Sequence, residues 1–310
     1  MDTLIRIEQA LQVAVATGES AGCPPRLAAA VRHAVFPGGA RIRPQLCIAV
    51  ARACGDSDPA LADAAAAAIE FLHCASLVHD DLPCFDDAAL RRGRASVHSA
   101  FGERLAVLAG DALIVLAYQT IGLSGARSPA RMSRLIGTVS RGVGMPFGIV
   151  AGQAWECEPR VALSDYQRAK TGALFAAATA AGAESAGVDG DIWRALGEWL
   201  GEAYQVADDL RDVLADPAEL GKPIGQDVAL GRPSSAIEHG LVGAIEHFDR
   251  LVACAIEAIP PCRGSSQLRA LVRMEAERLV PKAWCDQVRQ PHAATAMAAP
   301  RRVKTPTAAN

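Results

Sequence analysis

Two groups of aspartates stand out in the sequence, because each places at least three carboxylates within a few residues of otherwise apolar, helix-forming sequence. The first group contains Asp80, Asp81, Asp86 and Asp87, and the second spans residues 208–212. Carboxylates this close repel one another unless a cation neutralises them. Mg²⁺ prefers oxygen ligands and usually binds one or two carboxylates together with waters and substrate phosphates. The two groups therefore predict two walls of one pocket that holds a diphosphate between metal ions.

Helical geometry relates the members of each group. The first and last aspartates of the second group are four residues apart, so in a helix they lie on one face and can reach the same ion. In an unbroken helix Asp87 would best match Asp80, but Pro83 is expected to end the helix and to leave Asp86 to return from a loop. Either group alone would also fit a solvated helix end, where Asp is common.

Basic residues near both groups strengthen the diphosphate hypothesis. Arginine suits bidentate phosphate recognition, and lysine acts as a compact point charge. The basic segments are residues 37–44, 91–94, 170–172 and 221–223. His73 lies seven residues before Asp80, on the same helical face, and is a candidate for phosphate contact. His79 fits a plain helix-end residue equally well.

Helices are the elements expected to position these residues. Hydrophobic residues make up 51% of the 310 and aromatic residues only 5%, and Ala, Leu and Val favour helices over sheets. No segment shows the alternation typical of a strand. The predicted helices span residues 2–16, 25–35, 41–54, 58–82, 104–123, 129–143, 146–156, 164–187, 190–214, 233–258 and 265–280. We predict one all-α domain over residues 1–285 and a disordered tail over 286–310, which is rich in Ala, Pro, Thr and basic residues.

Composition and charge argue against several other classes of protein. A net charge of −3 gives no electrostatic reason to expect nucleic acid as a partner. The nine cysteines are scattered singly, and the N-terminus does not have the form of a signal peptide, so the cytoplasm is the expected compartment. The apolar run from Leu105 to Leu123 contains Asp111, which favours a fully buried core helix over a membrane span.

The sequence resembles the trans-isoprenyl diphosphate synthases, and among them the bacterial geranylgeranyl diphosphate synthases. The resemblance covers residues 25–280 and is carried by residues 38–44 (GGARIRP), 79–94, 152–153, 170–172, 204–209 and 221–222. It implies an all-α domain of the isoprenoid synthase type around a deep central cavity. It also implies a homodimer without membrane insertion that acts on small-molecule prenyl diphosphates.

The same resemblance assigns roles to individual residues. It implies that Asp80, Asp86 and Asp208 bind Mg²⁺, three ions per site, and so selects Asp86 over Asp87. The residues implied for the allylic diphosphate are Arg91, Lys170, Thr171, Gln205 and Lys222, with Lys170 also counted among the catalytic residues. Those implied for isopentenyl diphosphate are Arg43, His73 and Arg92. Ala75 and Ser76 are implied to limit product length, and two small residues there predict a C20 product.

The chain departs from the family pattern at several positions. Ala40 replaces the usual lysine of the GGKRxRP motif, which removes a charge that Arg41 is expected to supply. Arg211 stands within the second aspartate motif, where an apolar residue is common, and Arg232 stands where a lysine is frequent.

The expected activity is the Mg²⁺-dependent, head-to-tail condensation of isopentenyl diphosphate with an allylic diphosphate to give geranylgeranyl diphosphate. One alternative is a farnesyl diphosphate synthase. A class I terpene cyclase usually carries an Asn/Ser/Glu-type second metal motif, and a non-catalytic regulatory subunit of a prenyl synthase typically loses an aspartate motif. Both aspartate motifs are intact here, which argues against the last two alternatives.

Overall fold

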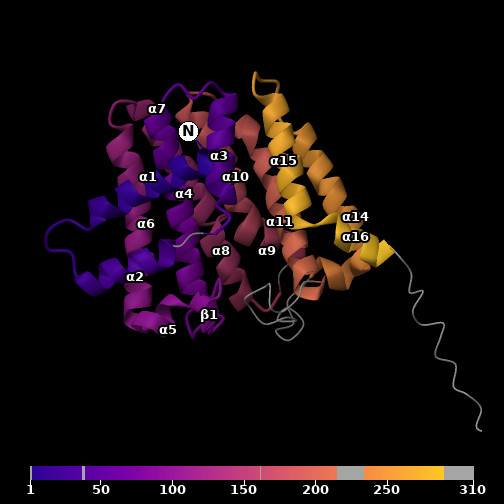
Figure 1. Ribbon diagram of the computed structural model, residues 1–310, viewed down its shortest axis with the longest axis horizontal. Helices are drawn as coiled ribbons and strands as arrows, with labels where there is room; N and C mark the ends of the chain where they lie inside the picture. The colour runs from indigo at the N-terminus through magenta and orange to yellow at the C-terminus, as the bar shows by residue number, and fades with distance from the viewer. Residues whose placement is uncertain (1, 37–38, 161, 215–233, 290–310) are drawn as a thin grey trace, which may run out of the picture.

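The computed structural model describes residues 2–36, 39–160, 162–214 and 234–289, which are mostly helical (Figure 1). The described helices and strands are α1 (Thr3–Gly18), α2 (Pro25–Val35), α3 (Ile42–Ala53), α4 (Pro59–Asp80), β1 (Leu90–Arg91), β2 (Arg94–Ala95), α5 (Val97–Phe101), α6 (Glu103–Gly125), α7 (Pro129–Val143), α8 (Ile149–Ala154), η1 (Trp155–Cys157), α9 (Leu163–Gln167), η2 (Arg168–Gly172), α10 (Ala173–Ser185), η3 (Asp191–Trp193), α11 (Arg194–Leu214), α14 (Ser235–Glu257), α15 (Ser265–Leu279) and α16 (Lys282–Arg289).

Helix α10 lies at the centre of the bundle and packs against α3, α4, α7 and α11 (Figure 1). Its residues from Leu174 to Ser185 are all buried, as expected for a helix that is apolar on every side. Small residues let its neighbours approach closely: a Cβ on Gly182 would lie 2.3 Å from the carbonyl oxygen of Cys47 on α3. Because α4 and α11 both pack on α10, the two helices that carry the aspartate groups share one support.

Helix α4 begins and ends close to the predicted positions. The carboxylate of Asp58 accepts a hydrogen bond from the backbone N–H of Leu61 at 3.2 Å, and Pro59 is the first helical residue. Both features stabilise a helix N-terminus. The helix ends at Asp80, before Pro83, so the first aspartate group is divided between the helix end and the loop that follows.

Several short strands and helices of the structure were not predicted from the sequence. Strands β1 and β2 pair as an antiparallel hairpin and are too short to show any alternation. Their turn places Arg92 and Gly93 at φ values of 54° and 72°, the left-handed backbone that a tight hairpin turn requires. Helices α5 and α16 were also not predicted. Helix α16 includes residues 286–289, which had been assigned to the tail, and residues 290–310 of the predicted tail lie outside the described residues.

Two predicted helices are divided in the structure. The helix expected over 146–156 consists of α8, which begins only at Ile149, and the turn η1; the backbone of Gly148, just before α8, is extended, with φ of −89° and ψ of −175°. The helix expected over 164–187 consists of α9, the π-helical turn η2 and α10. A π-helical turn inside an α-helix is rare and is frequently found at functional sites.

Helix α6 is only partly buried, so the prediction of a fully buried core helix over this segment was wrong. Leu108, Val115 and Leu123 are 52%, 64% and 62% exposed, because α6 packs on α4 through its opposite face. By length and apolar composition α4 and α6 could each cross a membrane, although most of α4 is buried within the bundle. The exposed face of α6 therefore needs a separate explanation.

Candidate diphosphate and metal site

The loop after α4 brings Asp86, rather than Asp87, back towards Asp80. The backbone N–H of Asp86 donates to the carbonyl oxygen of Asp80 at 3.0 Å. Asp87 has a φ of 45° and is exposed, and its carboxylate lies 3.8 Å from the ring of His98. The helical spacing that matched Asp87 to Asp80 therefore does not apply beyond the helix end.

Asp80 has the electrostatic character of a cation ligand. Its Oδ1 atom is buried and has no hydrogen-bond donor, and the Nζ atom of Lys170 lies 3.6 Å away. Burial raises the pKa of the Asp80 carboxyl, Lys170 lowers it, and the nearby Asp86 raises it again. A bound cation would satisfy the buried oxygen and remove the repulsion between the two carboxylates.

Asp81 has a different role from its neighbour. It is 2% exposed, and its carboxylate accepts hydrogen bonds from Nε of Arg91, at 2.9 Å, and from Nη2. Arg91 lies on the β1 strand, so this ion pair holds the hairpin against the end of α4. Asp81 thus positions a basic group instead of facing a ligand.

The aspartates of the second group also differ from one another in burial and hydrogen bonding. Asp209 is 1% exposed and accepts hydrogen bonds from Gln205 Nε2 at 3.0 Å and from the backbone N–H of Ser235 at 2.7 Å, which ties α11 to the start of α14. Asp208 is only partly buried. Asp212, which helical spacing placed on the same face as Asp208, is buried.

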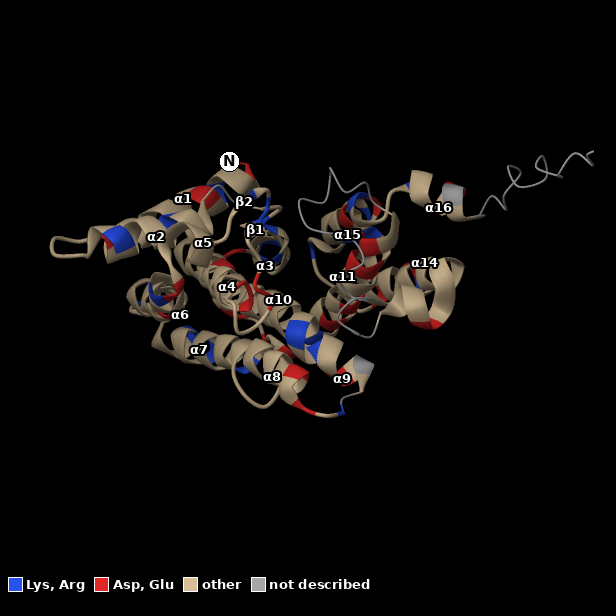
Figure 2. Cartoon of the chain, turned by 90° about the horizontal axis from the view of Figure 1, so that it is seen from below, with Lys and Arg blue, Asp and Glu red and all other residues tan. Residues whose placement is uncertain are grey.

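The turn η2 connects the two aspartate groups. Lys170 reaches Asp80, and the next residue, Thr171, donates its hydroxyl to Gln205 Oε1 on α11 at 2.9 Å. Seen from below, acidic segments of α4 and α11 and basic segments near β1 and α9 surround the middle of the molecule (Figure 2). Among the described residues, no group of three or more Asp, Glu, His or Cys side chains is arranged to hold a metal ion.

Two glycines allow η2 to lie so close to its neighbours. A Cβ on Gly152 of α8 would lie 2.3 Å from the backbone nitrogen of Lys170, and a Cβ on Gly201 of α11 would lie 2.5 Å from the Cα of Gly172. Only glycine permits such backbone approach. The position of Lys170 and Thr171 is therefore set by packing between helices distant in the sequence.

Arg43 and His73 meet on the side of α3 and α4. Nη1 of Arg43 lies 3.4 Å from Nε2 of His73, and its guanidinium stacks on the Phe175 ring at 4.4 Å and near the Tyr204 ring at 5.5 Å. Burial, followed by the charges of Arg43 and Arg92, holds the pKa of His73 well below its usual range. A neutral His73 can accept a hydrogen bond from Arg43.

Arg92 lies at the tip of the hairpin beside Gly39 of the GGARIRP motif. A Cβ on Gly39 would lie 2.6 Å from Cζ of Arg92, so the missing side chain makes room for the guanidinium. Arg92 is exposed and is therefore accessible to a ligand. This contact gives a structural reason for glycine at position 39.

Arg41 does not supply the charge that is lost with lysine at position 40, contrary to the prediction from the sequence. Its side chain is 1% exposed and pairs with Glu8 of α1 at 2.7 Å and with Glu70 of α4 at 2.5 Å. It also donates to the carbonyl oxygen of Val35 at 2.8 Å. With its hydrogen-bonding groups engaged inside the protein, Arg41 joins α1, α3 and α4 instead of facing a diphosphate.

The remaining predicted residues fall into two sets. Lys222 and Arg232 lie outside the described residues. Ala75 is 2% exposed, within the main apolar core, and Ser76 is partly buried with its hydroxyl donating to the carbonyl oxygen of His73 at 2.8 Å. Both side chains are small, so neither fills much space on α4.

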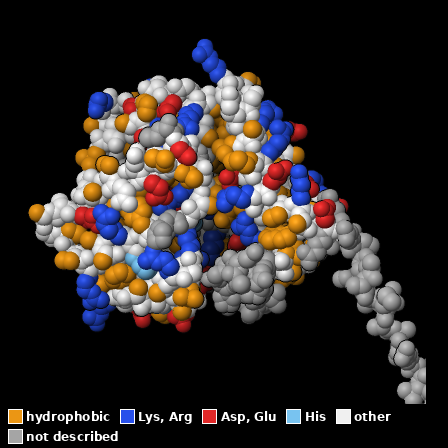
Figure 3. Space-filling model, viewed as in Figure 1, with side chains coloured by type: hydrophobic (Ala, Val, Ile, Leu, Met, Phe, Trp, Pro, Cys, Tyr) orange, Lys and Arg blue, Asp and Glu red, His pale blue; other side chains and the backbone are white. Residues whose placement is uncertain are grey.

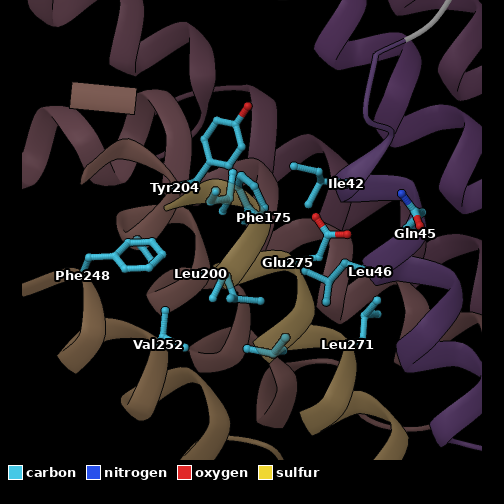
Figure 4. A pocket seen from close by; sticks show the side chains of 14 residues that line it. Ile42, Gln45, Leu46, Phe175, Leu200, Tyr204, Phe248, Val252, Leu271 and Glu275 are labelled. Carbon is cyan, nitrogen blue, oxygen red and sulfur yellow. The ribbon is translucent and has the colours of Figure 1, made fainter. Parts of the chain in front are cut away.

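The surface is hollowed near the middle of the face shown in Figure 3, with Lys and Arg side chains at the floor of the hollow. A separate apolar chamber lies between α3, α10, α11, α14 and α15 (Figure 4). Phe175 and Tyr204, the rings that stack with Arg43, form part of its wall, and Glu275 is its acidic residue. None of its lining residues belongs to an aspartate motif.

One acidic residue at the site, Glu156, was not predicted from the sequence. Glu156 lies 2.5 Å from Lys170 Nζ and accepts a hydrogen bond from the hydroxyl of Tyr166 at 2.5 Å. Glu156 lies outside both aspartate groups, and its position just after the Gly152-Gln153 motif was the available signal.

An all-α bundle with two aspartate motifs on either side of a lysine and a threonine defines a protein that binds diphosphates. Comparison with known proteins agrees: residues 24–256 match the polyprenyl synthetase family. The chain is 52% identical to geranylgeranyl diphosphate synthase of Cereibacter sphaeroides over 276 residues, covering 89% of this chain and 96% of that protein. It is 48% identical to the enzyme of that name from Rhodobacter capsulatus over 275 residues, covering 89% and 95%.

Solved structures agree with the sequence relatives. A Helicobacter pylori geranyltransferase, crystallised with magnesium and isoprenyl diphosphate, superimposes with a TM-score of 0.74 at 26% identity, covering 90% of this chain and 98% of that one. The chain belongs to the polyprenyl synthetase family, and the predicted all-α isoprenoid synthase fold is confirmed.

Proposed function

We propose that this protein joins isopentenyl diphosphate head-to-tail to an allylic diphosphate and releases geranylgeranyl diphosphate as its main product. The observation that carries the proposal is the position of η2: Lys170 lies beside Asp80, and Thr171 donates to Gln205, which donates to Asp209 of the second aspartate group. The names of the Cereibacter and Rhodobacter relatives support the C20 product.

The carboxylates proposed to hold Mg²⁺ are Asp80, Asp86 and Asp208. The Oδ1 atom of Asp80 is buried and accepts no hydrogen bond, so it is available to coordinate a cation. The Helicobacter relative was crystallised with magnesium. When bound, the Mg²⁺ ions, which we take to be three, would neutralise charge that develops on the departing diphosphate. Asp80 and Asp208 lie on α4 and α11, which both pack on α10, and Asp86 lies in the loop after α4.

Basic and polar groups of the chain bind the two substrates in this proposal. Lys170, Thr171 and Gln205 line the allylic diphosphate site together with Arg91 and Lys222. Arg43, His73 and Arg92 bind isopentenyl diphosphate, where the neutral His73 accepts a hydrogen bond from Arg43 and helps to orient its guanidinium. Charge-assisted hydrogen bonds from these groups stabilise the diphosphate as the allylic C–O bond breaks. Apolar walls exclude water from the allylic cation, and the double bond of isopentenyl diphosphate attacks it to form the new C–C bond. The tertiary cation that results loses a proton to the released diphosphate, which gives the double bond of the product.

The test is product analysis of the purified protein with Mg²⁺, isopentenyl diphosphate and each allylic primer, followed by mass spectrometry. A C20 diphosphate as the main product is expected. A chain that stops at C15 would identify a farnesyl diphosphate synthase, and a cyclic hydrocarbon would identify a terpene cyclase. Turnover that requires another synthase would identify a regulatory subunit.

We also propose a homodimer in the cytoplasm, with the exposed face of α6 as its interface. Leu108, Val115 and Leu123 lie on one side of this helix and are more than half exposed. An apolar stripe of this kind is typical of a surface covered by another protein chain. Asp111 lies on the same exposed face, and a carboxylate there would be costly in a lipid bilayer.

A further inference from the structure

Lys170 lies between the carboxylates of Asp80 and Glu156. Glu156, which has no role in the proposed function, is the nearer of the two. The Nζ atom of Lys170 is 2.5 Å from Oε1 of Glu156 and 3.6 Å from Oδ1 of Asp80. A lysine has a flexible stem and three donors, so its ammonium moves towards whichever acceptor is strongest. The relative strength of these two carboxylates therefore decides where Lys170 rests before substrate binds.

Glu156 is fixed by other contacts. The hydroxyl of Tyr166 donates to its Oε1 atom at 2.5 Å, and Nε2 of Gln153 donates to its Oε2 atom at 3.1 Å. The ring of Tyr166 also lies 5.7 Å from Nζ of Lys170, within the range of a cation–π contact. Both oxygens of Glu156 thus have donors, whereas Oδ1 of Asp80 is buried with none.

We propose that Glu156 is a positioning residue, which holds the Lys170 ammonium beside the site and so leaves the Asp80 carboxylate available for metal. This inference rests on the proposed roles of Asp80 and Lys170. Without the charge of Glu156, the nearer of the two carboxylates is lost and Asp80 is the one that remains beside Lys170. A direct Lys170–Asp80 pair would then have to be displaced before Mg²⁺ could bind.

Glu156→Gln is the variant that tests this inference, with binding of inorganic pyrophosphate measured by calorimetry across a Mg²⁺ titration. We expect the Mg²⁺ concentration for half-maximal pyrophosphate binding to rise about tenfold, the effect of one charge-assisted hydrogen bond. The affinity of the variant for pyrophosphate at saturating Mg²⁺ should stay near that of the unmodified protein. Glu156→Asp, which keeps the charge, should restore most of the Mg²⁺ dependence.

Two further variants separate this mechanism from a general loss of structure. Glu158→Gln removes the same charge from an exposed position in the same segment and should leave the Mg²⁺ dependence unchanged. In a Lys170→Ala background, Glu156→Gln should have no further effect, because no ammonium remains to compete for Asp80.

The contrary results are distinct. An unchanged Mg²⁺ dependence in Glu156→Gln, an equal loss of affinity at limiting and saturating Mg²⁺, or an effect that persists without Lys170 would overturn the positioning role. If the unmodified protein bound no pyrophosphate with Mg²⁺, the proposed diphosphate site itself would be wrong.

Discussion

Within each aspartate group, neighbouring carboxylates have separate tasks. Asp81 and Asp209 are buried and hold a hairpin arginine and the start of α14, respectively. Asp80 instead keeps a buried oxygen without a donor. A motif of adjacent aspartates therefore combines one residue that stabilises the surroundings with one that is suited to a cation.

Asp80→Asn should lower turnover about a hundredfold or more at saturating Mg²⁺, because the proposed metal site loses a charged ligand. Steady-state kinetics across a Mg²⁺ titration would measure this change. Thermal unfolding should change little, since the substitution relieves repulsion with Asp86. Asp87→Asn, at an exposed position in the same loop, is the matched control. Near-normal turnover in Asp80→Asn would refute the proposed metal site.

Arg41→Ala should destabilise the protein by about 3–5 kcal/mol, because it leaves the buried Glu70 carboxylate without its partner. Urea unfolding would measure the loss. Arg52→Ala, on the exposed side of α3, the helix that Arg41 precedes, should change the free energy of unfolding by about 0.5 kcal/mol or less. A selective rise in KM for isopentenyl diphosphate with unchanged stability would instead make Arg41 a substrate ligand.

Ala75→Tyr should shift the main product from C20 to C15, because a large ring on α4 would shorten the space for the growing chain. A packing cost of about 1–3 kcal/mol is expected, since Ala75 lies in the apolar core. Mass spectrometry of the products gives the answer, and Ala75→Ser should still make C20. If Ala75→Tyr continued to make C20, residues deeper in the fold would set the product length.

At the scale of elements, the site depends on how closely three helical segments approach one another. The π-helical turn η2 lies against α8 through Gly152 and against α11 through Gly201. A longer side chain at either glycine would push η2 away, and with it both Lys170 and Thr171. The geometry of the basic groups is thus a consequence of backbone packing.

Gly201→Ala should destabilise the protein by about 1–3 kcal/mol, because its Cβ would meet the Cα of Gly172 at 2.5 Å. It should also raise the KM for the allylic diphosphate. Gly137→Ala on α7 is the control, since a Cβ there meets nothing within 4 Å and alanine favours a helix by about 1 kcal/mol. Chemical denaturation and kinetics of both variants would check this, and equal stabilisation of the two would contradict close packing at Gly201.

At the scale of the whole molecule, the described chain leaves one apolar helix face uncovered. Helix α6 buries one side against α4 and exposes the other. That distribution is unusual for an isolated soluble domain and is explained if another copy of the chain packs there.

Val115→Glu should therefore shift the protein from dimer to monomer, because it places a charge in the centre of the proposed interface. Sedimentation velocity would measure the change. Val13→Glu makes the same substitution at a valine of α1 that is 68% exposed and should leave the association state unchanged. A dimer that tolerates Val115→Glu would locate the interface elsewhere.

The sequence by itself determined the helical class, the boundaries of α2 and α7, and the two aspartate groups. These features follow from local rules: proline at a helix start, the helical period, and carboxylates that require a cation. The family resemblance then supplied the expected roles of the basic residues.

Only the tertiary structure decided which charged groups meet. Arg41 and Arg43 are two residues apart, yet one is locked between Glu8 and Glu70 and the other stacks on Phe175. Glu156 belongs to the site through contacts with Lys170 and Tyr166, which residue spacing in the sequence does not predict. The partners of a charged side chain come from segments distant in the sequence, so they are fixed only when the helices pack.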